Sequence, residues 1–227
     1  MVTAIVLAAG RSTRMGGGPN KQFIELLGKP LLYYSLAAFE QCPVVDAVVL
    51  VRRPDYARQA EQVVRQFGFR KVCAFADGGV ERQDSVGNGL KGCGSQTDIV
   101  AVHDGARPLV TPALIESTVA SAREFGTGIA ATKVVDTIKE ANEDRTVVRT
   151  VDRTRLWAVQ TPQTVKLGLL RTAYAKVMEK KIVVTDEAAA VELLGEKVHL
   201  VETPFLNLKV TMPSDLAMAE ALLSVRP

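Results

Sequence analysis

The chain has 227 residues, 47% of them hydrophobic and 23% charged, which is the composition of a folded globular protein with one large core. Its net charge of +3 is too small to predict a nucleic-acid-binding surface, and no stretch approaches the ~18 consecutive apolar residues of a membrane span. The three cysteines lack the spacing of a metal site or a disulfide framework. The first apolar run lacks the basic segment that precedes a signal-peptide core. We therefore expect a cytoplasmic protein that binds neither nucleic acid nor membrane.

The first candidate site follows the first predicted strand. Residues 2–7 form an apolar, β-branched run, which predicts a buried strand that stops at the small residues 8–10. The glycines and proline after it predict a loop, and this loop carries Arg11, Arg14 and Lys21. Small residues let a backbone approach a ligand closely, and exposed amides with fixed cations suit a polyphosphate. Since ligands of α/β sheets bind at the carboxyl ends of strands, we interpret this loop as the floor of a nucleoside triphosphate site. A surface loop with solvated cations is the alternative.

Two common nucleotide-binding fingerprints are absent from this loop. The dinucleotide motif Gly-x-Gly-x-x-Gly needs further glycines after Gly10, where the chain has residues 11–14 of other types. The P-loop needs Ser or Thr after its lysine, but Lys21 is followed by Gln22. The sequence therefore argues against a dinucleotide-binding site and against a P-loop.

Beyond this loop, predicted strands and helices alternate along the chain. Apolar β-branched runs predict strands at residues 47–51, 71–75, 98–102, 126–132 and 197–201. Apolar residues at helical spacing predict helices at residues 31–41, 54–67, 86–92, 112–125, 165–180, 188–194 and 213–223. The alternation predicts an α/β fold with a mostly parallel sheet, flanked by helices and joined by right-handed crossovers.

Polar residues follow two further predicted strands. Ser85 lies in the early turns of a helix after residues 78–79, where its hydroxyl can bond a base or a phosphate, or serve an ordinary helix start. The Asp104 carboxylate can help to bind magnesium or a ribose hydroxyl, and a structural ion pair between Asp104 and Arg107 is the alternative. Lys209 lies between two apolar residues, so we expect it to face an anion.

Residues 134–151 lack a helical period and contain two extended segments around the turn-forming residues 142–144. A polar hairpin of this length cannot bury much surface by itself. We therefore predict a projecting β-hairpin arm at residues 134–151 that packs against a second subunit, with a solvated flap as the alternative. We assign structural roles to His103, to Trp157 in the core, and to residues 185–187 as caps of the following helix.

A series of short motifs covers nearly the whole chain in a fixed order. They are Leu7-Ala8-Ala9-Gly10, Arg14-Met15, Pro19-Asn20-Lys21-Gln22, Gly78-Gly79, Arg82, Ser85-Val86, His103-Asp104-Gly105-Ala106-Arg107-Pro108, Asp136-Thr137, Val151-Asp152-Arg153, Thr161-Pro162-Gln163, Thr185-Asp186-Glu187-Ala188 and Lys209-Val210-Thr211. With these motifs the chain resembles the 2-C-methyl-D-erythritol 4-phosphate cytidylyltransferases of the non-mevalonate isoprenoid pathway. Each motif alone has low specificity, whereas the ordered set is highly specific. The chain departs from the family pattern at Asn20, which separates the proline and lysine of the first loop.

The resemblance implies a single Rossmann-like nucleotidyltransferase domain over residues 1–227, in a homodimer whose hairpin arms interlock. It implies an enzyme that transfers the cytidylyl group of CTP, with Mg²⁺, to 2-C-methyl-D-erythritol 4-phosphate. The products would be 4-diphosphocytidyl-2-C-methyl-D-erythritol and pyrophosphate. The loop at residues 16–20 is expected to be mobile until the triphosphate arrives.

The resemblance also implies roles for individual residues. Stabilisation of the transition state is expected from Arg14 and Lys21, and positioning of the methylerythritol phosphate from Arg153 and Lys209. The expected CTP contacts are Ala8, Ala9, Gly10, Gly79, Ser85, Asp104, Ala106 and Arg107, with Asp104 as the candidate metal ligand. Contacts to the substrate from the arm region of the partner are expected from Thr137, Arg153 and Thr161.

The chemistry of this reaction agrees with the residue types present. The nucleophile is a phosphate monoester, which is already anionic at neutral pH, so no general base is needed. The obstacle is the repulsion between a phosphate and a triphosphate, which fixed cations can neutralise while they hold the attack in line.

Three alternatives differ from this interpretation. A ribitol 5-phosphate cytidylyltransferase is similar, but its first loop usually reads Ala-Gly-Gly, whereas this chain has Ala8-Ala9-Gly10. A dinucleotide-dependent oxidoreductase lacks its fingerprint here. A non-catalytic nucleotide-binding module would leave Arg14, Lys21 and Lys209 without a joint purpose.

Overall fold

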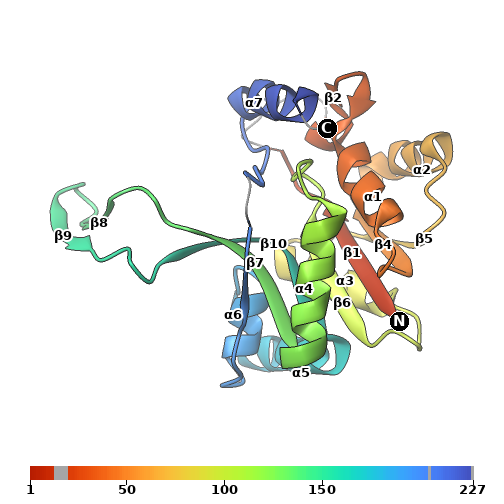
Figure 1. The fold of residues 1–227 in the computed structure, drawn as a ribbon. Helices are drawn as coiled ribbons and strands as arrows, with labels where there is room; N and C mark the ends of the chain where they lie inside the picture. The colour runs from red at the N-terminus through yellow and green to blue at the C-terminus, as the bar shows by residue number, and fades with distance from the viewer. Residues whose placement is uncertain (13–19, 204–205, 226–227) are drawn as a thin grey trace.

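The computed structural model describes residues 1–12, 20–203 and 206–225. The predictions for Arg14 and for the mobility of the loop at residues 16–19 therefore lie outside the described residues. A seven-stranded sheet forms the centre of the molecule, with helices on both faces and a hairpin that extends away from it (Figure 1). The α/β fold class and the projecting hairpin are thus as predicted. Within these described ranges, no helix combines the length and the apolar character that crossing a bilayer requires.

The sheet is mostly parallel. Its strand order is β11 (Leu200–Glu202), β7 (Thr127–Lys133), β10 (Trp157–Lys166), β6 (Ile99–Asp104), β1 (Val2–Ala8), β4 (Ala47–Arg52) and β5 (Val72–Asp77). Strand β1 pairs in parallel with β4 and β6, and β4 pairs in parallel with β5. Strand β10 is antiparallel to both of its neighbours, β6 and β7. The carboxyl ends of β1, β4, β5 and β6 therefore meet at one edge, where α/β proteins bind ligands.

Among the described residues, six helices cover the two faces of the sheet. One face packs against α1 (Leu31–Gln41), α2 (Ala57–Phe67) and α4 (Pro112–Phe125), and the other packs against α3 (Arg82–Lys91), α5 (Leu167–Lys180) and α6 (Glu187–Glu192). A last helix, α7 (Pro213–Ser224), packs beside the short strands β2 (Glu25–Leu26) and β3 (Lys29–Pro30) at one end of the molecule. Two short 3₁₀ segments, Lys21–Phe23 and Pro54–Tyr56, precede the first two α-helices.

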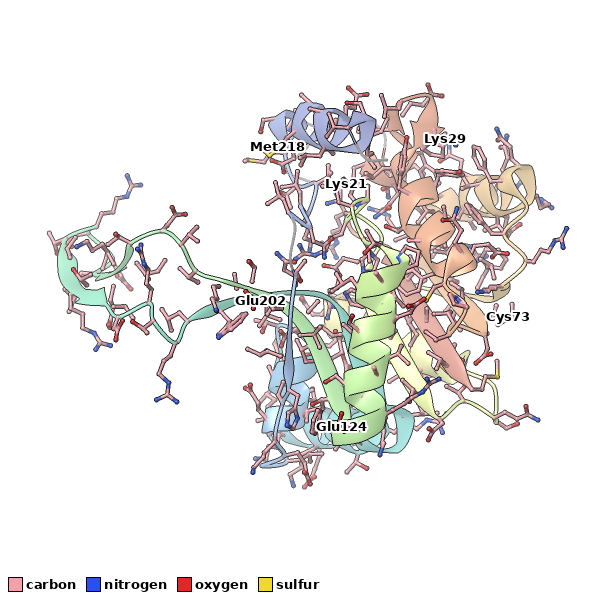
Figure 2. The ribbon with its side chains drawn as sticks, in the orientation of Figure 1. Lys21, Lys29, Cys73, Glu124, Glu202 and Met218 are labelled. Carbon is pink, nitrogen blue, oxygen red and sulfur yellow. The ribbon has the colours of Figure 1, made fainter. Side chains whose placement is uncertain are left out.

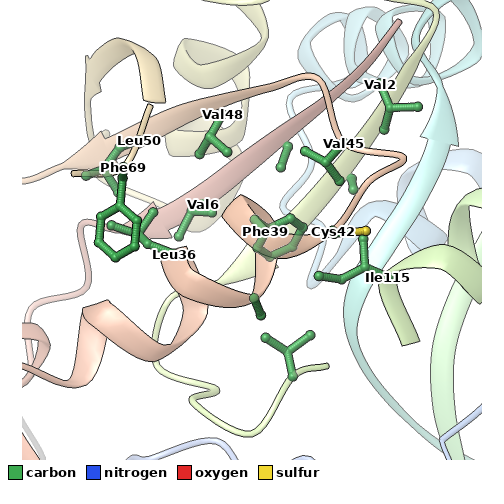
Figure 3. Packing of buried hydrophobic residues seen from close by; sticks show 14 of the residues in the cluster. Val2, Val6, Leu36, Phe39, Cys42, Val45, Val48, Leu50, Phe69 and Ile115 are labelled. Atoms are coloured by element: carbon green, nitrogen blue, oxygen red, sulfur yellow. The ribbon is translucent and has the colours of Figure 1, made fainter. Parts of the chain in front are cut away.

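The sheet is buried on both faces because alternate residues of each central strand point to opposite layers. In β1, Val6 packs in the cluster that contains Leu36 and Phe39 of α1, as Figure 3 shows. Its neighbour Ile5 packs in the opposite cluster with Val86 of α3. This two-sided burial explains why the strand reads as a continuous apolar run in the sequence.

The structure differs from the prediction at several elements. Helix α3 begins at Arg82 and not at residue 86, and strand β11 spans Leu200–Glu202 and not residues 197–201. Strand β10 was not predicted, because Pro162 interrupts a run rich in polar residues and proline disfavours a central strand. The helix predicted from residue 165 consequently begins at Leu167. Trp157 is half-buried at the base of the hairpin, with the Lys133 ammonium 5.5 Å from its ring centroid, and so does not belong to the core as predicted.

The predicted hairpin is formed by β8 (Ile138–Ala141) and β9 (Val147–Val151), which pair with each other in a separate two-stranded sheet. Residues 134–151 leave the sheet after β7 and return to it at β10, and the hairpin projects well beyond the helices (Figure 1). Nearly all of its side chains are exposed.

Candidate active site

A cavity of about 610 Å³ opens at the carboxyl edge of the sheet. Its walls come from the loops after β1, β4, β5 and β6 and from residues 209–211 near the end of the chain. Among the residues predicted to bind the nucleotide or the substrate, it brings together Ala9, Gly10, Lys21, Gly79, Ser85, Asp104, Ala106 and Lys209. Ala8 is buried at the end of β1, directly before this lining.

The loops after β1 and β5 touch each other at one side of the cavity. A Cβ atom on Gly78 would lie 2.2 Å from the Cβ of Ala9, and a Cβ on Gly79 would lie 2.1 Å from that of Asp84. Only glycine permits these approaches, which are far shorter than a carbon–carbon contact. The two loops therefore present their backbones to the cavity, as a polyphosphate site requires.

Ser85 holds the second of these loops in place. Its hydroxyl accepts a hydrogen bond of 3.0 Å from the amide of Gly79 and donates one of 3.3 Å to the carbonyl of Glu81. The N-cap of α3 is Glu81, which forms a capping box with Asp84. Ser85 is therefore not an ordinary cap, and it shapes the loop that lines the cavity.

Asp104 lies at the centre of the charged groups of the cavity. Its two oxygens accept separate hydrogen bonds, one of 2.6 Å from the Lys209 ammonium and one of 3.2 Å from Nε of Arg82. Burial by itself would raise the pKa of this carboxyl, but the charges of Arg82 and Lys209 hold its pKa well below the usual range. The prediction that Lys209 faces an anion is confirmed, and the anion is Asp104.

The alternative prediction, an ion pair between Asp104 and Arg107, is wrong, because Asp104 pairs with Arg82 and Lys209. The Arg107 guanidinium donates a hydrogen bond of 2.7 Å to the backbone carbonyl of Asn207, and its burial lowers the pKa of the guanidinium. Arg107 thus ties the loop after β6 to the segment that carries Lys209. Its side chain is directed to that segment, whereas Ala106 lines the cavity.

Lys21 approaches the same wall of the cavity from the other end of the chain. It begins the 3₁₀ segment Lys21–Phe23, is largely buried, and donates a hydrogen bond of 2.7 Å to the carbonyl of Val210. Figure 2 shows Lys21 at the end of the molecule nearest to α7. Two ammonium groups, from Lys21 and Lys209, therefore converge on one side of the cavity although they are far apart in the sequence.

Thr161 and His103 form the layer behind Asp104. The Thr161 hydroxyl oxygen accepts a hydrogen bond of 3.1 Å from the backbone amide of Asp104 and lies 3.1 Å from Nδ1 of His103. The prediction that Thr161 reaches substrate from the arm region is wrong about its place. The chain has already returned from the arm into β10 by this residue, and Thr161 is buried next to β6. His103 is a buried structural residue, as predicted.

Thr137 lies on the arm, Arg153 lies two residues after it, and neither lines this cavity. Thr137 and Arg153 are both exposed, and the Arg153 guanidinium donates a hydrogen bond to the carbonyl of Val135 within the arm. The arm extends away from the sheet (Figure 1), and neither residue lines the cavity of this chain.

Arg82 and Glu187 are two charged residues whose place in this site was not predicted. Arg82 appeared only as part of a motif, and residues 185–187 were interpreted as caps. Asp186 is indeed the N-cap of α6 and accepts from the amide of Ala189 at 2.9 Å. Glu187 instead pairs with Arg82 at 2.7 Å. The available signal was a glutamate directly before the apolar residues 188–191, since a buried charge needs a partner.

Asp104 is also the predicted metal ligand. In the described ranges, no group of three or more His, Cys, Asp and Glu side chains is placed to hold a metal ion. Asp104 can supply one carboxylate, although each of its oxygens already accepts from a cation. This donor set suits a magnesium ion that takes most of its ligands from phosphates and water, as Mg²⁺ in nucleotide enzymes commonly does.

Residues 2–225 match the profile of a protein family described as 2-C-methyl-D-erythritol 4-phosphate cytidylyltransferase. The chain is 44% identical over 228 residues to the protein of that name from Pelotomaculum thermopropionicum, with 99% of this chain and 95% of the relative covered. It is 44% identical over 223 residues to the one from Geobacillus kaustophilus, with 98% and 97% covered. Among solved structures, it is similar to the 4-diphosphocytidyl-2C-methyl-D-erythritol synthase of Anaerococcus prevotii, with a TM-score of 0.86, 29% identity and 98% of each chain covered.

Proposed function

The chain belongs to the 2-C-methyl-D-erythritol 4-phosphate cytidylyltransferase family, and from this premise we propose how its residues carry out the reaction. It is a nucleotidyltransferase of the non-mevalonate isoprenoid pathway. It joins the cytidylyl group of CTP to 2-C-methyl-D-erythritol 4-phosphate and releases 4-diphosphocytidyl-2-C-methyl-D-erythritol and pyrophosphate.

One observation carries the assignment of the site. Lys21 and Lys209 line the same cavity as two loops that approach each other closely at Gly78. Backbone amides and small residues suit the nucleotide, and the ammonium groups suit the phosphates that must meet. We place CTP against residues 8–10 and 79–85, and the sugar phosphate near Lys209.

In this arrangement the phosphate monoester attacks the α-phosphorus of CTP in line with the departing pyrophosphate. The monoester oxygen is already charged, so the attack needs no proton transfer to the protein. Lys21, together with Arg14, neutralises the five-coordinate phosphorus and the pyrophosphate as charge develops on them. Lys209 borders the place of the acceptor, and Asp104 keeps Lys209 oriented.

We propose that magnesium accompanies the triphosphate. Asp104 is the carboxylate that would face it, and the remaining ligands would be phosphate oxygens and water. When bound, the ion supplies further neutralisation of phosphate charge.

We further propose that the enzyme is a homodimer in which the arm crosses to the other subunit. The arm exposes Val135, Val147 and Val148, with 78%, 60% and 53% of their surface in solvent, and exposed apolar residues gathered on one segment mark interaction surfaces. Arg153 of the partner subunit and Thr137 of the partner subunit would then reach the acceptor. The free thiols of the three cysteines fit a reducing compartment, the cytoplasm.

The reaction is tested by measuring pyrophosphate release with CTP and Mg²⁺. We expect turnover with 2-C-methyl-D-erythritol 4-phosphate and at most slow turnover with ribitol 5-phosphate. The reverse preference would assign the chain to ribitol phosphate, and CTP binding without turnover of either acceptor would make it a non-catalytic nucleotide-binding module.

A further inference from the structure

A glutamate in the core is joined to the cavity by a chain of charged side chains. Glu187 lies at the first turn of α6, and its side chain has no exposed surface. Its two oxygens accept hydrogen bonds of 2.7 and 3.0 Å from the two terminal nitrogens of Arg82, and one of them also accepts 3.1 Å from the Tyr174 hydroxyl. This fork-to-fork geometry is the strongest and most directional form of an ion pair.

Arg82 carries the interaction onward. Both terminal nitrogens of Arg82 are bound to Glu187, so only Nε is left to contact Asp104. Nε donates a hydrogen bond of 3.2 Å to an oxygen of the Asp104 carboxylate. Asp104 can then give its other oxygen to Lys209 at 2.6 Å. Acidic and basic groups thus alternate from the core to the cavity. The charges of Glu187 and Asp104 outweigh the burial of Arg82 and raise the pKa of its guanidinium.

We infer that Glu187 is a positioning residue for the transfer reaction, which acts through Arg82 and Asp104 to keep Lys209 directed at the acceptor phosphate. A guanidinium prefers to grip a carboxylate with two nitrogens. Without the anion at position 187, the fork of Arg82 would turn to Asp104, take both of its oxygens and displace Lys209. Glu187 therefore prevents a competing arrangement in addition to stabilising the fold. The inference rests on the proposed role of Lys209.

The start of α6 is fixed to the sheet in a way that holds Glu187 in register. Gln163 of β10 donates a hydrogen bond of 3.0 Å to the Asp186 carboxylate and accepts one of 3.0 Å from the amide of Ala188. The residues on either side of Glu187 are thus pinned to the strand beside β6, which carries Asp104. Such support limits the carboxylate to one position relative to Arg82.

The test is a double-mutant cycle between Glu187→Gln and Lys209→Ala, with kcat and KM measured for both substrates. We expect Glu187→Gln to lower kcat/KM for the sugar phosphate by about tenfold or more, with the KM for CTP changed by less than about threefold. In the Lys209→Ala background the same substitution should have almost no further effect, because the residue through which Glu187 acts is gone. Independent, multiplicative losses would overturn the inference.

Tyr174→Phe is the matched control, since it removes a hydrogen bond to the same carboxylate but leaves the ion pair with Arg82. It should lower the urea midpoint while kcat/KM for the sugar phosphate stays within about twofold of wild type. If Tyr174→Phe lowers kcat/KM for the sugar phosphate as much as Glu187→Gln does, Glu187 and its partners act only through the stability of the fold. If Glu187→Gln does not fold, Glu187→Asp keeps the charge on a shorter side chain and should show a smaller loss of the same kind.

A crystal structure of the Glu187→Gln variant separates this inference from the proposed function. We expect the Arg82 fork on Asp104 and Lys209 withdrawn from it. An unchanged contact between Lys209 and Asp104 would refute the positioning role even in an active enzyme. If the wild-type protein does not transfer the cytidylyl group, the proposed function is refuted. The position of Lys209 in the Glu187→Gln variant would still show whether Glu187 positions Lys209.

Discussion

Nδ1 of the His103 ring lies 3.1 Å from the hydroxyl oxygen of Thr161, and that oxygen accepts a hydrogen bond from the amide of Asp104. Nε2 lies 3.4 Å from the carbonyl of Arg107, which can only accept, so Nε2 carries the ring proton of the neutral imidazole and Nδ1 accepts from the Thr161 hydroxyl. Burial lowers the pKa of the ring and so favours its neutral form. A neutral histidine thus supports the central carboxylate of the site from behind.

The first prediction concerns stability at mildly acidic pH. Burial lowers the pKa of His103 to about 3, from an ordinary value of 6.5. Below pH 6.5 the unfolded chain gains a proton that the folded chain does not, so stability falls as pH falls. His103 should cost about 2 kcal/mol of unfolding free energy between pH 7 and pH 5, a range in which few carboxylates titrate. Urea unfolding at several pH values measures this, and His103→Gln should flatten the dependence. An equal slope in the variant would contradict the assignment.

The second prediction concerns the cations of the first loop. Lys21→Ala should lower kcat by roughly 10²–10³ because a donor to the developing charge is lost, while the affinity for CTP stays close to normal. Arg14→Ala should behave in the same way. Stopped-flow pyrophosphate release gives kcat, and calorimetry gives CTP affinity. Unchanged turnover in either variant would remove that residue from the catalytic set.

The third prediction separates acceptor binding from nucleotide binding. Lys209→Ala should mainly raise the KM for the sugar phosphate, because the lost ammonium is held at the cavity wall by Asp104. Lys91→Ala, on an exposed position of α3, is the matched control and should leave both KM values unchanged. An effect of Lys209→Ala on CTP binding alone would contradict the assignment.

The fourth prediction tests the contact between the two glycine loops. Gly78→Ala introduces a Cβ at 2.2 Å from that of Ala9, which must push the loops apart and should cost about 1–3 kcal/mol and raise the KM for CTP. Gly87→Ala in α3 is the control, since its Cβ would meet nothing within 4 Å and should stabilise the helix by about 1 kcal/mol. Thermal unfolding measures the stability of the two variants, and initial rates give their KM for CTP. If the two variants have the same stability and the same KM for CTP, the contact between the loops is refuted.

The fifth prediction tests the crossing of the arm. Arg153→Ala and Lys21→Ala should each be nearly inactive alone. If Arg153 of the partner subunit completes each site, mixed dimers of the two variants contain one intact site, so re-equilibrated mixtures should recover about a quarter of wild-type activity. A mixture as inactive as its components, although dimers exchange, would place Arg153 outside the neighbouring site.

Much of the fold was predictable from local pattern. The strands β1, β4, β6 and β7 read as apolar runs because both of their faces are largely buried, and this property is visible along a single stretch of chain. The edge strand β5 was also predicted from its apolar residues, although alternate residues of it are exposed. The antiparallel strand β10 was not predictable. It mixes apolar and polar residues and includes Pro162, and it is a strand because of its neighbours β6 and β7, which lie far away in the sequence.

The residues of the site also fall into those that the local sequence indicates and those that only the tertiary structure brings together. Glycines, small residues and cations around Gly10 and Lys21 already indicate a phosphate-binding loop, because the chemistry of such a loop is contained in adjacent residues. The partners of buried charges are different. Glu187 and Arg82 are 105 residues apart, as are Lys209 and Asp104, and no periodicity marks which acid will meet which base. Only the packing of α3, α6 and β6 decides this, because a buried charge is stable only where the fold brings its counter-charge within hydrogen-bonding distance.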